Sequence, residues 1–311
     1  MLSHPMSHLQ LKQLRQLVAV AENGSIRAAA KQLSIAQPAL SRSIRAIEDD
    51  LQVKLMERGP RGIVLTKYGE TLCNYAKIID ANLRFAAEEF DDIRGARSGT
   101  VRMGIGPHEG FTIAHRAIDK MFERRPNLDV TLIDGDFEAL AARLLAGEID
   151  FILGPAPLEG VTPGLTREIL ANIRPVVAVR SQHPLARKKS IDIKQLVDVD
   201  WILPAEGTNA RTRLNNTFWR HGLVPPDGPI SAYPSMTAVA LVKQRDLVAI
   251  LPRQLIDEDR KAGLIKVLPV ASEDFLLPVR LTTREFGKLS PACREMIAEI
   301  KKVCEEIGDQ L

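Results

Sequence analysis

The residues best suited to chemistry lie in a basic stretch near the start of the chain. Residues 9–68 carry ten Lys and Arg side chains against five Asp and Glu, a net charge of +5, while the remainder of the chain has a net charge of −2. A basic block on a slightly acidic body favours a polyanionic partner for that block alone. Charge by itself is equally compatible with an ordinary solvated basic surface.

One predicted helix in this block places polar side chains where they could bind a nucleic acid. Apolar residues at helical spacing predict a buried stripe formed by Leu40, Ile44, Ile47 and Leu51. At about 100° per residue, the side of the helix away from this stripe carries Gln37, Pro38, Ser41, Arg42 and Arg45. Arg can bond a guanine edge bidentately, Gln an adenine edge, and Ser a base or a phosphate. We expect this surface, called the recognition face below, to lie in a DNA major groove. The alternative is a surface helix with solvated charges.

A second basic feature follows this helix. Two β-prone runs, 53–57 and 63–65, flank a Gly- and Pro-containing turn that carries Arg58 and Arg61. A basic hairpin of this kind after a helix-turn-helix is a wing, whose arginines can enter the minor groove or bind phosphate. Taken alone, the turn is more typical of a solvent-exposed loop.

The elements that must position these side chains are three short helices. Leu11, Leu14, Val18 and Ala21 recur at intervals of three and four and predict a first helix that ends at Asn23-Gly24. Ser25 is placed to cap a second helix, which ends near Leu33. Only residues 34–36 then precede the helix with the recognition face, a spacing that favours a helix-turn-helix.

This part of the chain is similar to a known family. The DNA-binding domain of LysR-type transcriptional regulators resembles the stretch GSIRAAAKQLSIAQPALSRSIRAIEDDLQVKLMERGPRGIVLTKYGE in element order and spacing. The DNA-contacting residues that we expect are Ser25, Gln37, Pro38, Ser41, Arg42, Arg45, Arg58, Arg61 and Thr66. The family usually carries Ser or Thr where this chain has Ala36. A helix cap of about 0.5–2 kcal/mol, and with it a candidate phosphate contact, is therefore missing.

A long helix is predicted next. Residues 66–93 contain no Pro, and their apolar residues step alternately by four and three, forming a heptad seam of Leu72, Ala76, Ile79, Leu83, Ala86, Phe90 and Ile93. We expect two chains to pair through this seam, because two-fold pairing presents two recognition helices to one duplex. The resemblance also implies a linker and dimer helix here. The alternative is an amphipathic helix packed on its own body.

The C-terminal two-thirds of the chain alternates strand and helix patterns, which predicts an α/β domain with parallel sheet. We expect strands at 101–105, 128–133, 149–153, 173–180, 201–203, 247–251 and 276–283, and helices at 112–123, 137–146, 208–221, 235–244 and 291–307. The resemblance implies a two-lobed, periplasmic-binding-protein-like effector domain. The expected division is a winged helix-turn-helix at 1–66, a linker helix at 67–95 and a regulatory body at 96–311, with lobe 1 at about 100–167 and 273–311 and lobe 2 at about 168–272.

Candidate ligand residues follow from this architecture, because ligands of open α/β sheets bind beyond the carboxyl ends of strands and at helix N-termini. The effector-binding candidates are Gly106, Pro107, His108, Asp134, Pro204, Gly207, Thr208, Arg211 and Met236. Free N–H groups and the Thr208 hydroxyl could hold a carboxylate, with Arg211 or Arg213 nearby. The resemblance implies a small organic acid as the effector. Many members carry Ser or Thr where this chain has Gly106, so one hydroxyl that could bind the ligand is missing here. Either His108 takes its place or the effector differs. These segments could also be plain connecting loops.

Other classes of protein receive little support from the sequence. The Gly104-Ile-Gly106 pair lacks the third glycine of a dinucleotide fingerprint, since residue 109 is Glu, and there is no GxSxG, P-loop or HExxH motif. The chain has three cysteines, an odd number that argues against a disulfide framework. Cys293 and Cys304 lie eleven residues apart on one predicted helix, about 16 Å, which is too far for a disulfide and argues against an oxidant-sensing pair. We expect no cofactor and no metal. The start of the chain has no leader pattern, and no apolar run approaches the roughly 18 residues of a membrane span, so a cytoplasmic protein is expected.

The sequence therefore predicts a homo-oligomeric regulator, dimeric through the linker helix and assembled into a tetramer, whose partners are promoter DNA and a small-molecule effector. RNA polymerase would be a further partner of an activator, and no membrane partner is expected. Two rivals remain: a cytosolic solute-binding protein and an enzyme on the same two-lobed fold. The basic block and the missing signal peptide argue against the first rival, and the absence of a catalytic motif argues against the second.

Overall fold

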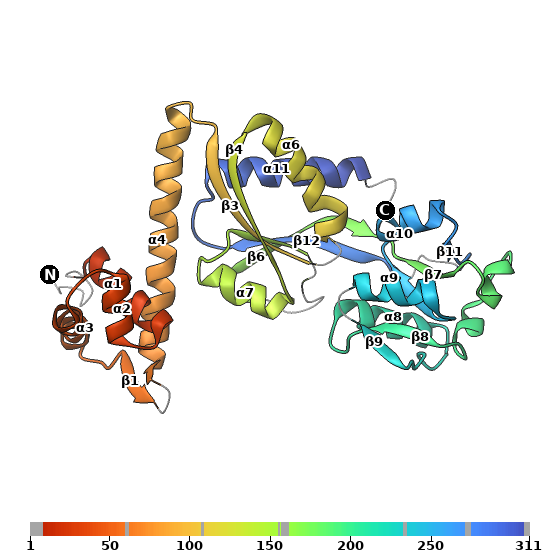
Figure 1. Ribbon diagram of the computed structural model, residues 1–311, viewed down its shortest axis with the longest axis horizontal. Coiled ribbons are helices and arrows are strands. Elements are labelled where there is room, and N and C mark those ends of the chain that lie inside the picture. Colours follow the sequence, from red (N-terminus) through yellow and green to blue (C-terminus); the bar gives the residue numbers. More distant parts are fainter. Residues whose placement is uncertain are drawn as a thin grey trace. The chain divides into compact units, whose positions relative to one another are not determined.

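The structure is a computed structural model that describes residues 9–59, 62–106, 109–154, 156, 162–232, 235–270 and 275–307. The chain divides into two compact units (Figure 1). The first contains residues 1–87 with 145–148, and the second contains residues 88–144 with 149–311. Among the described residues, no helix has both the length and the apolar character to cross a membrane.

The first unit contains the predicted winged helix-turn-helix, here called the head. Its elements are α1 (Leu11–Asn23), α2 (Ile26–Gln32), α3 (Gln37–Leu51), β1 (Met56–Gly59) and β2 (Gly62–Leu65), followed by the start of α4 (Lys67–Ile93). The helices enclose one apolar core whose fully buried side chains include Leu17, Leu40 and Ile47. β1 and β2 pair in antiparallel fashion, with Met56 opposite Leu65.

Two glycines let the wing and the linker helix pack closely on the head. Gly62 has a φ of +128°, and a Cβ there would lie 2.6 Å from the carbonyl oxygen of Gly24, so only glycine fits. The Ile63 amide then donates to that same oxygen at 2.8 Å. A Cβ on Gly69 of α4 would lie 1.9 Å from the Leu55 carbonyl oxygen. The wing is thus held against the turn between α1 and α2, and the base of α4 against the segment that follows α3.

The heptad seam of α4 is divided by the tertiary structure. Leu72 and Ala76 are buried in the core of the head. Ile79, Leu83, Phe90 and Ile93 are 41%, 44%, 64% and 78% exposed. The head therefore buries the start of the seam, while the later seam residues stay exposed in the single chain, and pairing of two chains through them remains a prediction.

The second unit, which forms the body, begins with a lobe built on a five-stranded sheet of order β4-β3-β5-β12-β6. Its strands are β3 (Ser98–Ile105), β4 (Asn127–Asp134), β5 (Phe151–Gly154), β6 (Leu165–Ile173) and β12 (Leu277–Arg284). The helices are the π-helical η1 (Gly110–Ala114), α6 (His115–Arg124), α7 (Phe137–Leu145) and α11 (Pro291–Ile307). α6 and α11 lie together on the sheet (Figure 1), and their buried side chains share one core with those of its strands.

The second lobe contains another five-stranded sheet, of order β11-β7-β10-β8-β9. Its elements are β7 (Val176–Arg180), β8 (Trp201–Pro204), β9 (Ile230–Ala232), β10 (Val248–Leu251), β11 (Ile265–Val267), α8 (Asn209–Arg220), α9 (Ser235–Gln244), α10 (Arg253–Lys261) and the 3₁₀ helices η2 (Pro184–Arg187) and η3 (Ile193–Leu196). One apolar cluster is centred on Trp201 and Phe218, whose rings meet edge to face with centroids 6.2 Å apart. A separate cluster includes residues of α9 and α10.

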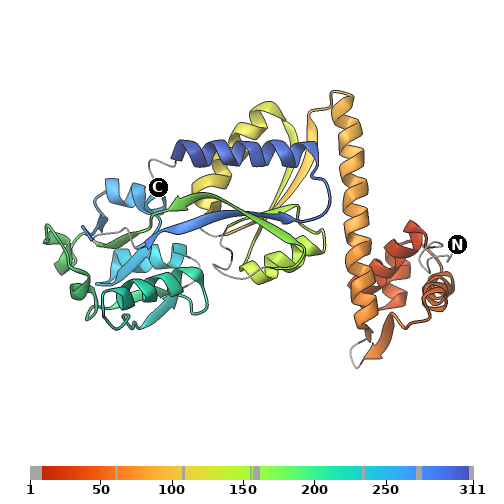
Figure 2. The same cartoon turned by 180° about the vertical axis from the view of Figure 1, so that it is seen from behind.

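The two-lobed α/β body is as expected, but details of its sheets differ. Both sheets are mixed rather than parallel, since β12 is antiparallel to β5 and β6, and β7 is antiparallel to β10 and β11. The expected strand at 173–180 is two strands, β6 and β7, that belong to different sheets and are separated by Arg174 and Pro175. Proline has no N–H to continue a ladder. The expected lobe boundary at 168 falls inside β6, which pairs with β12 from Leu165 to Ile173 (Figure 2).

Candidate DNA-binding and effector-binding sites

The recognition face of α3 is open to solvent. Gln37, Pro38, Arg42 and Arg45 are exposed and Ser41 is partly exposed, whereas the apolar stripe on the other side of the helix is buried. Arg42 and Arg45 form no ion pair within the part of the chain that the structure describes. The helix therefore presents polar donors and uncompensated positive charge together, which is the combination that base edges and phosphates require.

Buried polar contacts hold α3 in place. The Ser43 hydroxyl donates to the Gln16 side chain of α1 at 2.5 Å. Glu48, which is 7% exposed, accepts hydrogen bonds from the Leu55 amide at 2.9 Å and from Lys54 Nζ at 2.8 Å. Burial by itself would raise the pKa of Glu48, but these two donors outweigh burial and lower the pKa below its ordinary value. The ionised carboxylate thus ties the recognition helix to the segment that leads into the wing.

The remaining DNA-contacting candidates occupy two different settings. Arg58 in β1 is exposed and has no ion pair among the described residues, while Arg61 lies outside the described residues. Ser25 caps α2 by accepting from the Ala28 amide at 3.5 Å. The Thr66 hydroxyl donates to the Lys54 carbonyl at 2.6 Å and accepts from the Gly69 amide at 3.2 Å, so it caps α4. Both hydroxyls have a structural role in the head.

The start of α3 lacks a side-chain cap. Ala36 occupies the N-cap position and makes no side-chain hydrogen bond, and a proline stands in the first turn of the helix. Proline is well suited to this position because its missing N–H has no partner there in any helix. The structure therefore confirms that the helix cap expected from a Ser or Thr at residue 36 is missing.

In the first lobe, the effector candidates lie at the carboxyl ends of β3 and β4. Gly106 follows β3, and its amide donates to the Leu153 carbonyl of β5 at 2.9 Å. A Cβ on Gly154, the last residue of β5, would lie 2.8 Å from the Gly106 nitrogen, so the two strand ends are tightly joined. Asp134 ends β4 and is exposed. Pro107 and His108 lie outside the described residues.

In the second lobe, the candidates gather at the carboxyl end of β8. Thr208 caps α8, since its hydroxyl accepts from the Arg211 amide at 3.2 Å and donates to the Ala205 carbonyl at 2.7 Å. The intervening Gly207 has a φ of +78°. Arg211 pairs with Glu206 at 3.0 Å. The Thr208 hydroxyl is thus already engaged, and the positive charge of Arg211 is partly balanced.

Two further candidates of this lobe lie on neighbouring elements. Pro204 ends β8 and is opposite Ala232 of the parallel strand β9. Met236, in the first turn of α9, is 55% exposed. Because β9 leads to α9, the structure brings the end of β8 and the start of α9 to the same edge of the sheet.

Two further arginines also belong to these edges: Arg280, which the sequence analysis did not name, and Arg213, which it named only as a neighbour of the Thr208 site. Arg280 of β12 is only 9% exposed, lies opposite Gly154 of β5, and donates to the Ala156 carbonyl at 3.3 Å. Arg213 of α8 is partly buried, and its Nε is buried without a hydrogen-bond partner. A charged residue inside the apolar strand pattern of 276–283 was the available signal for Arg280.

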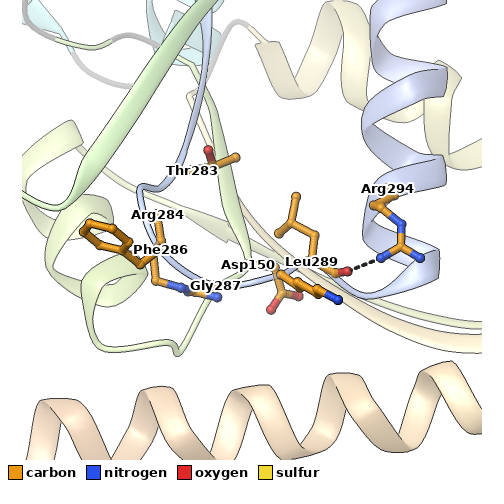
Figure 3. A pocket seen from close by; sticks show the side chains of 8 residues that line it. Asp150, Thr283, Arg284, Phe286, Gly287, Leu289 and Arg294 are labelled. Atoms are coloured by element: carbon orange, nitrogen blue, oxygen red, sulfur yellow. Dashed lines mark hydrogen bonds between the residues drawn. The ribbon is translucent and has the colours of Figure 1, made fainter.

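A pocket of about 270 Å³ lies elsewhere in the first lobe. Its lining includes Asp150, Arg284, Phe286 and Arg294 (Figure 3), and Arg294 donates to the Leu289 carbonyl at 2.6 Å. Asp150 precedes β5, so this pocket is at the amino end of that strand and not at the carboxyl end where ligands of such sheets bind. Arg284 uses its Nη1 to bond the Leu144 and Ile149 carbonyls. We assign these side chains to the support of the 285–290 turn.

Metal ligands and reactive thiols are the remaining side chains that could do chemistry. Within the described ranges, no group of three or more His, Cys, Asp or Glu side chains is arranged to hold a metal ion. Cys73, Cys293 and Cys304 are free and buried. Burial raises the pKa of Cys73 and of Cys304 to about 11, which keeps these thiols protonated and unreactive at neutral pH.

Comparison with known protein families matches nearly the whole chain in two parts. Residues 11–70 match the family described as "Bacterial regulatory helix-turn-helix protein, lysR family". Residues 94–305 match the family described as "LysR substrate binding domain". The first match covers the head with its recognition face, and the second covers both lobes of the body.

Individual proteins agree with these matches. The SDS degradation transcriptional activation protein of Pseudomonas sp. (strain ATCC 19151) is 30% identical, over 92% of this chain and 94% of that protein. The HTH-type transcriptional regulator GbpR of Rhizobium radiobacter is 29% identical, over 79% of this chain and 82% of that protein. A full-length OxyR variant from Pseudomonas aeruginosa is 21% identical with a TM-score of 0.72, covering 96% of this chain and 95% of that one, and supports the fold.

Proposed function

The chain belongs to the LysR family of DNA-binding transcriptional regulators, and from this premise we propose that it binds promoter DNA as a dimer and responds to a small organic acid. The observation that carries the proposal is the recognition face of α3, where exposed, unpaired arginines stand beside Gln37 and Ser41 on a helix fixed by its buried side. Such a face has no structural task within its own chain and is complementary to a major groove.

The proposed division of labour on DNA follows from what each side chain already contacts. Gln37, Ser41, Arg42 and Arg45 are free to bind base edges and phosphates, and Arg58 of the wing is free to bind the backbone or the minor groove. Ser25 and Thr66 cap helices, so we assign them to the positioning of backbone amides at phosphates instead of to base contacts.

Pairing of two chains through α4 supplies two heads for one operator. The exposed part of the seam, from Ile79 to Ile93, is an apolar stripe on a helix of 27 residues, and a second copy of the same stripe would cover it. We propose that dimers made in this way assemble further into a tetramer, and that an activator of this type would also contact RNA polymerase.

The effector is proposed to bind at the carboxyl ends of the strands in both lobes, near Gly106 and Asp134 in the first lobe and near Pro204, Thr208 and Met236 in the second. A ligand that prefers one arrangement of the lobes would raise the population of that arrangement, and the spacing of the heads would change with it. The protein is proposed to act without catalysis and in the cytoplasm, where bacterial DNA lies. Its curated relatives carry the names of transcriptional regulators.

The test is a fluorescence-anisotropy titration of the full-length protein against the DNA upstream of its own gene, at several salt concentrations. We expect nanomolar binding that is about 10³-fold or more tighter than for scrambled DNA. The variant Arg42→Ala should weaken binding and reduce the salt slope by about one, while Arg116→Ala on the exposed surface of α6 serves as the matched control. A protein that binds both DNAs equally weakly would instead be a solute-binding protein on this fold.

A further inference from the structure

Arg280 is an unusual residue for the middle of a sheet. It lies on β12 between β5 and β6, opposite Gly154 on one side and Ile169 on the other, and it is only 9% exposed. Its one hydrogen bond in the described structure goes from Nη1 to the Ala156 carbonyl at 3.3 Å. Arginine is almost never buried to this degree without a paired carboxylate, because a buried charge that lacks a partner is costly.

Arg213 approaches the same region from the second lobe. It lies in the first half of α8, the helix that begins after the carboxyl end of β8. Its Nε is buried and has no hydrogen-bond partner, and the Oδ1 of Asn215 on the same helix is also buried without one. Burial lowers the pKa of Arg213, and the positive charge of Arg280 lowers it further.

Three other arginines of the body that are buried or half-buried each have a carboxylate partner. Arg125 bonds both Glu295 and Asp92 at 2.6 Å, Arg180 bonds Asp246 at 2.7 Å, and Arg211 bonds Glu206 at 3.0 Å. In the described ranges, neither Arg213 nor Arg280 forms an ion pair.

A third arginine lies close to Arg280. Arg167 of β6 bonds Thr162 and stacks over the Phe137 ring at 4.9 Å. Burial lowers the pKa of Arg280, and the positive charge of Arg167 lowers it further. Arg213 and Arg280 are therefore two positive charges, one in each lobe, that form no ion pair in the described ranges.

We propose that the effector is a small organic dianion whose two acidic groups are bound by Arg280 from the first lobe and Arg213 from the second. The inference rests on the proposed function, in that it assumes an effector between the lobes, and it adds the charge of the effector and the two residues that bind it. A guanidinium bonds a carboxylate or phosphate in a bidentate manner, so two of them select for two acidic groups at a defined spacing. Binding would neutralise the mutual repulsion and draw the two lobes toward each other.

The experiment measures thermal shifts and calorimetric affinities on the full-length protein. The dianionic probes are malonate, succinate, glutarate and adipate, which vary the spacing, with glycerol 3-phosphate as a phosphate source of the same charge. Butyrate and valerate are the monoanionic controls. The variants are Arg280→Met and Arg213→Met, with Arg116→Met, an exposed arginine of α6, as the matched control for the loss of one positive charge.

We expect at least one dianion to raise the melting temperature of the wild type while the monoanions do not. Each of the two variants should weaken that dianion about 10- to 100-fold, as expected for loss of a charge-assisted hydrogen bond, and Arg116→Met should leave its affinity unchanged. Without ligand, Arg280→Met and Arg213→Met should melt at or above the wild-type temperature, because a buried unpaired charge has been removed.

Two results would overturn the inference: no dianion of the series stabilises the wild type, or both variants bind the dianion as tightly as the wild type does. Should Arg280→Met fail to fold, Arg213→Met decides alone, since its side chain lies on a helix surface of the other lobe. Operator binding measured on the same samples separates this inference from the proposed function. A protein that binds its operator but no dianion remains a regulator whose effector is of another class.

Discussion

Leu83 offers the sharpest test of pairing through α4, because the structure separates its role in association from its role in folding. It lies in the middle of the exposed part of the seam and is 44% exposed in the single chain. Leu83 belongs to none of the buried core clusters of the chain, so replacement by Asp leaves those clusters intact. In a two-fold dimer, however, the same position on both chains would face the partner helix, so that one substitution removes two contacts and introduces two carboxylates.

The magnitude follows from the exposed fraction. Full burial of a Leu side chain contributes about 1.5–3 kcal/mol, so covering a little under half of it contributes about 1 kcal/mol per copy, or about 2 kcal/mol per dimer. At about 1.4 kcal/mol for each factor of ten, Leu83→Asp should raise the dimer dissociation constant by at least about 30-fold. Desolvation of the two introduced carboxylates adds to this loss.

Sedimentation velocity over a range of protein concentrations measures the association, and circular dichroism checks that helix content is retained. The matched control is Asn82→Asp, which adds the same charge at the adjacent exposed position outside the seam. Operator affinity should fall together with dimerisation in Leu83→Asp and remain unchanged in the control. If Leu83→Asp sediments as the wild type does, or if Asn82→Asp dissociates equally, α4 is not the pairing element.

Three further outcomes are expected. Arg45→Ala should lower operator affinity by about 1–3 kcal/mol and relax base preference, as measured by anisotropy with single-base operator variants; unchanged specificity would remove Arg45 from the recognition face. Glu48→Ala should destabilise the head by about 1–3 kcal/mol in urea unfolding, because the buried Leu55 amide loses its acceptor. Because folding lowers the pKa of Glu48, the ionised carboxylate contributes fully to the free energy of unfolding above its unfolded pKa of about 4.3. This contribution is lost as the pH falls through the pKa of the folded state. The difference in the free energy of unfolding between wild type and variant should therefore vanish in acid. Gly69→Ala should destabilise the head by more than the usual helix gain of about 1 kcal/mol, because its Cβ would meet the Leu55 carbonyl oxygen at 1.9 Å; a stabilised variant in the same unfolding assay would contradict the close packing of α4.

The head could be predicted closely from the sequence because each of its signals is local. The apolar spacing of Leu40, Ile44 and Ile47 predicts which side of α3 is buried, and the structure confirms it. The glycine after Asn23 and the serine that caps α2 determine where α1 and α2 meet. Such patterns act over a few residues, so the side of the helix left for DNA follows without knowledge of the rest of the chain.

The body shows what local patterns leave open. The alternation of strands and helices indicates an α/β domain, but the polar and apolar residues of β6 do not alternate regularly, and the sequence does not predict this strand. Its partner β12 comes more than a hundred residues later, and pairing at that separation leaves no local trace. The same holds for α4, where a regular heptad pattern does not reveal that Leu72 and Ala76 are buried by the head while Leu83 and Phe90 are left exposed.

The sequence by itself therefore determined the class of the protein, its basic DNA-binding head and the order of its elements, because charge, periodicity and capping are properties of neighbouring residues. Only the tertiary structure decided which charges remain unpaired. Arg211 and Arg213 are close neighbours on α8, yet the first pairs with Glu206, while the second has a buried Nε without a hydrogen-bond partner. Burial and long-range contact set the cost of an unpaired charge, and both come into existence only when strands and helices distant in the chain are brought together.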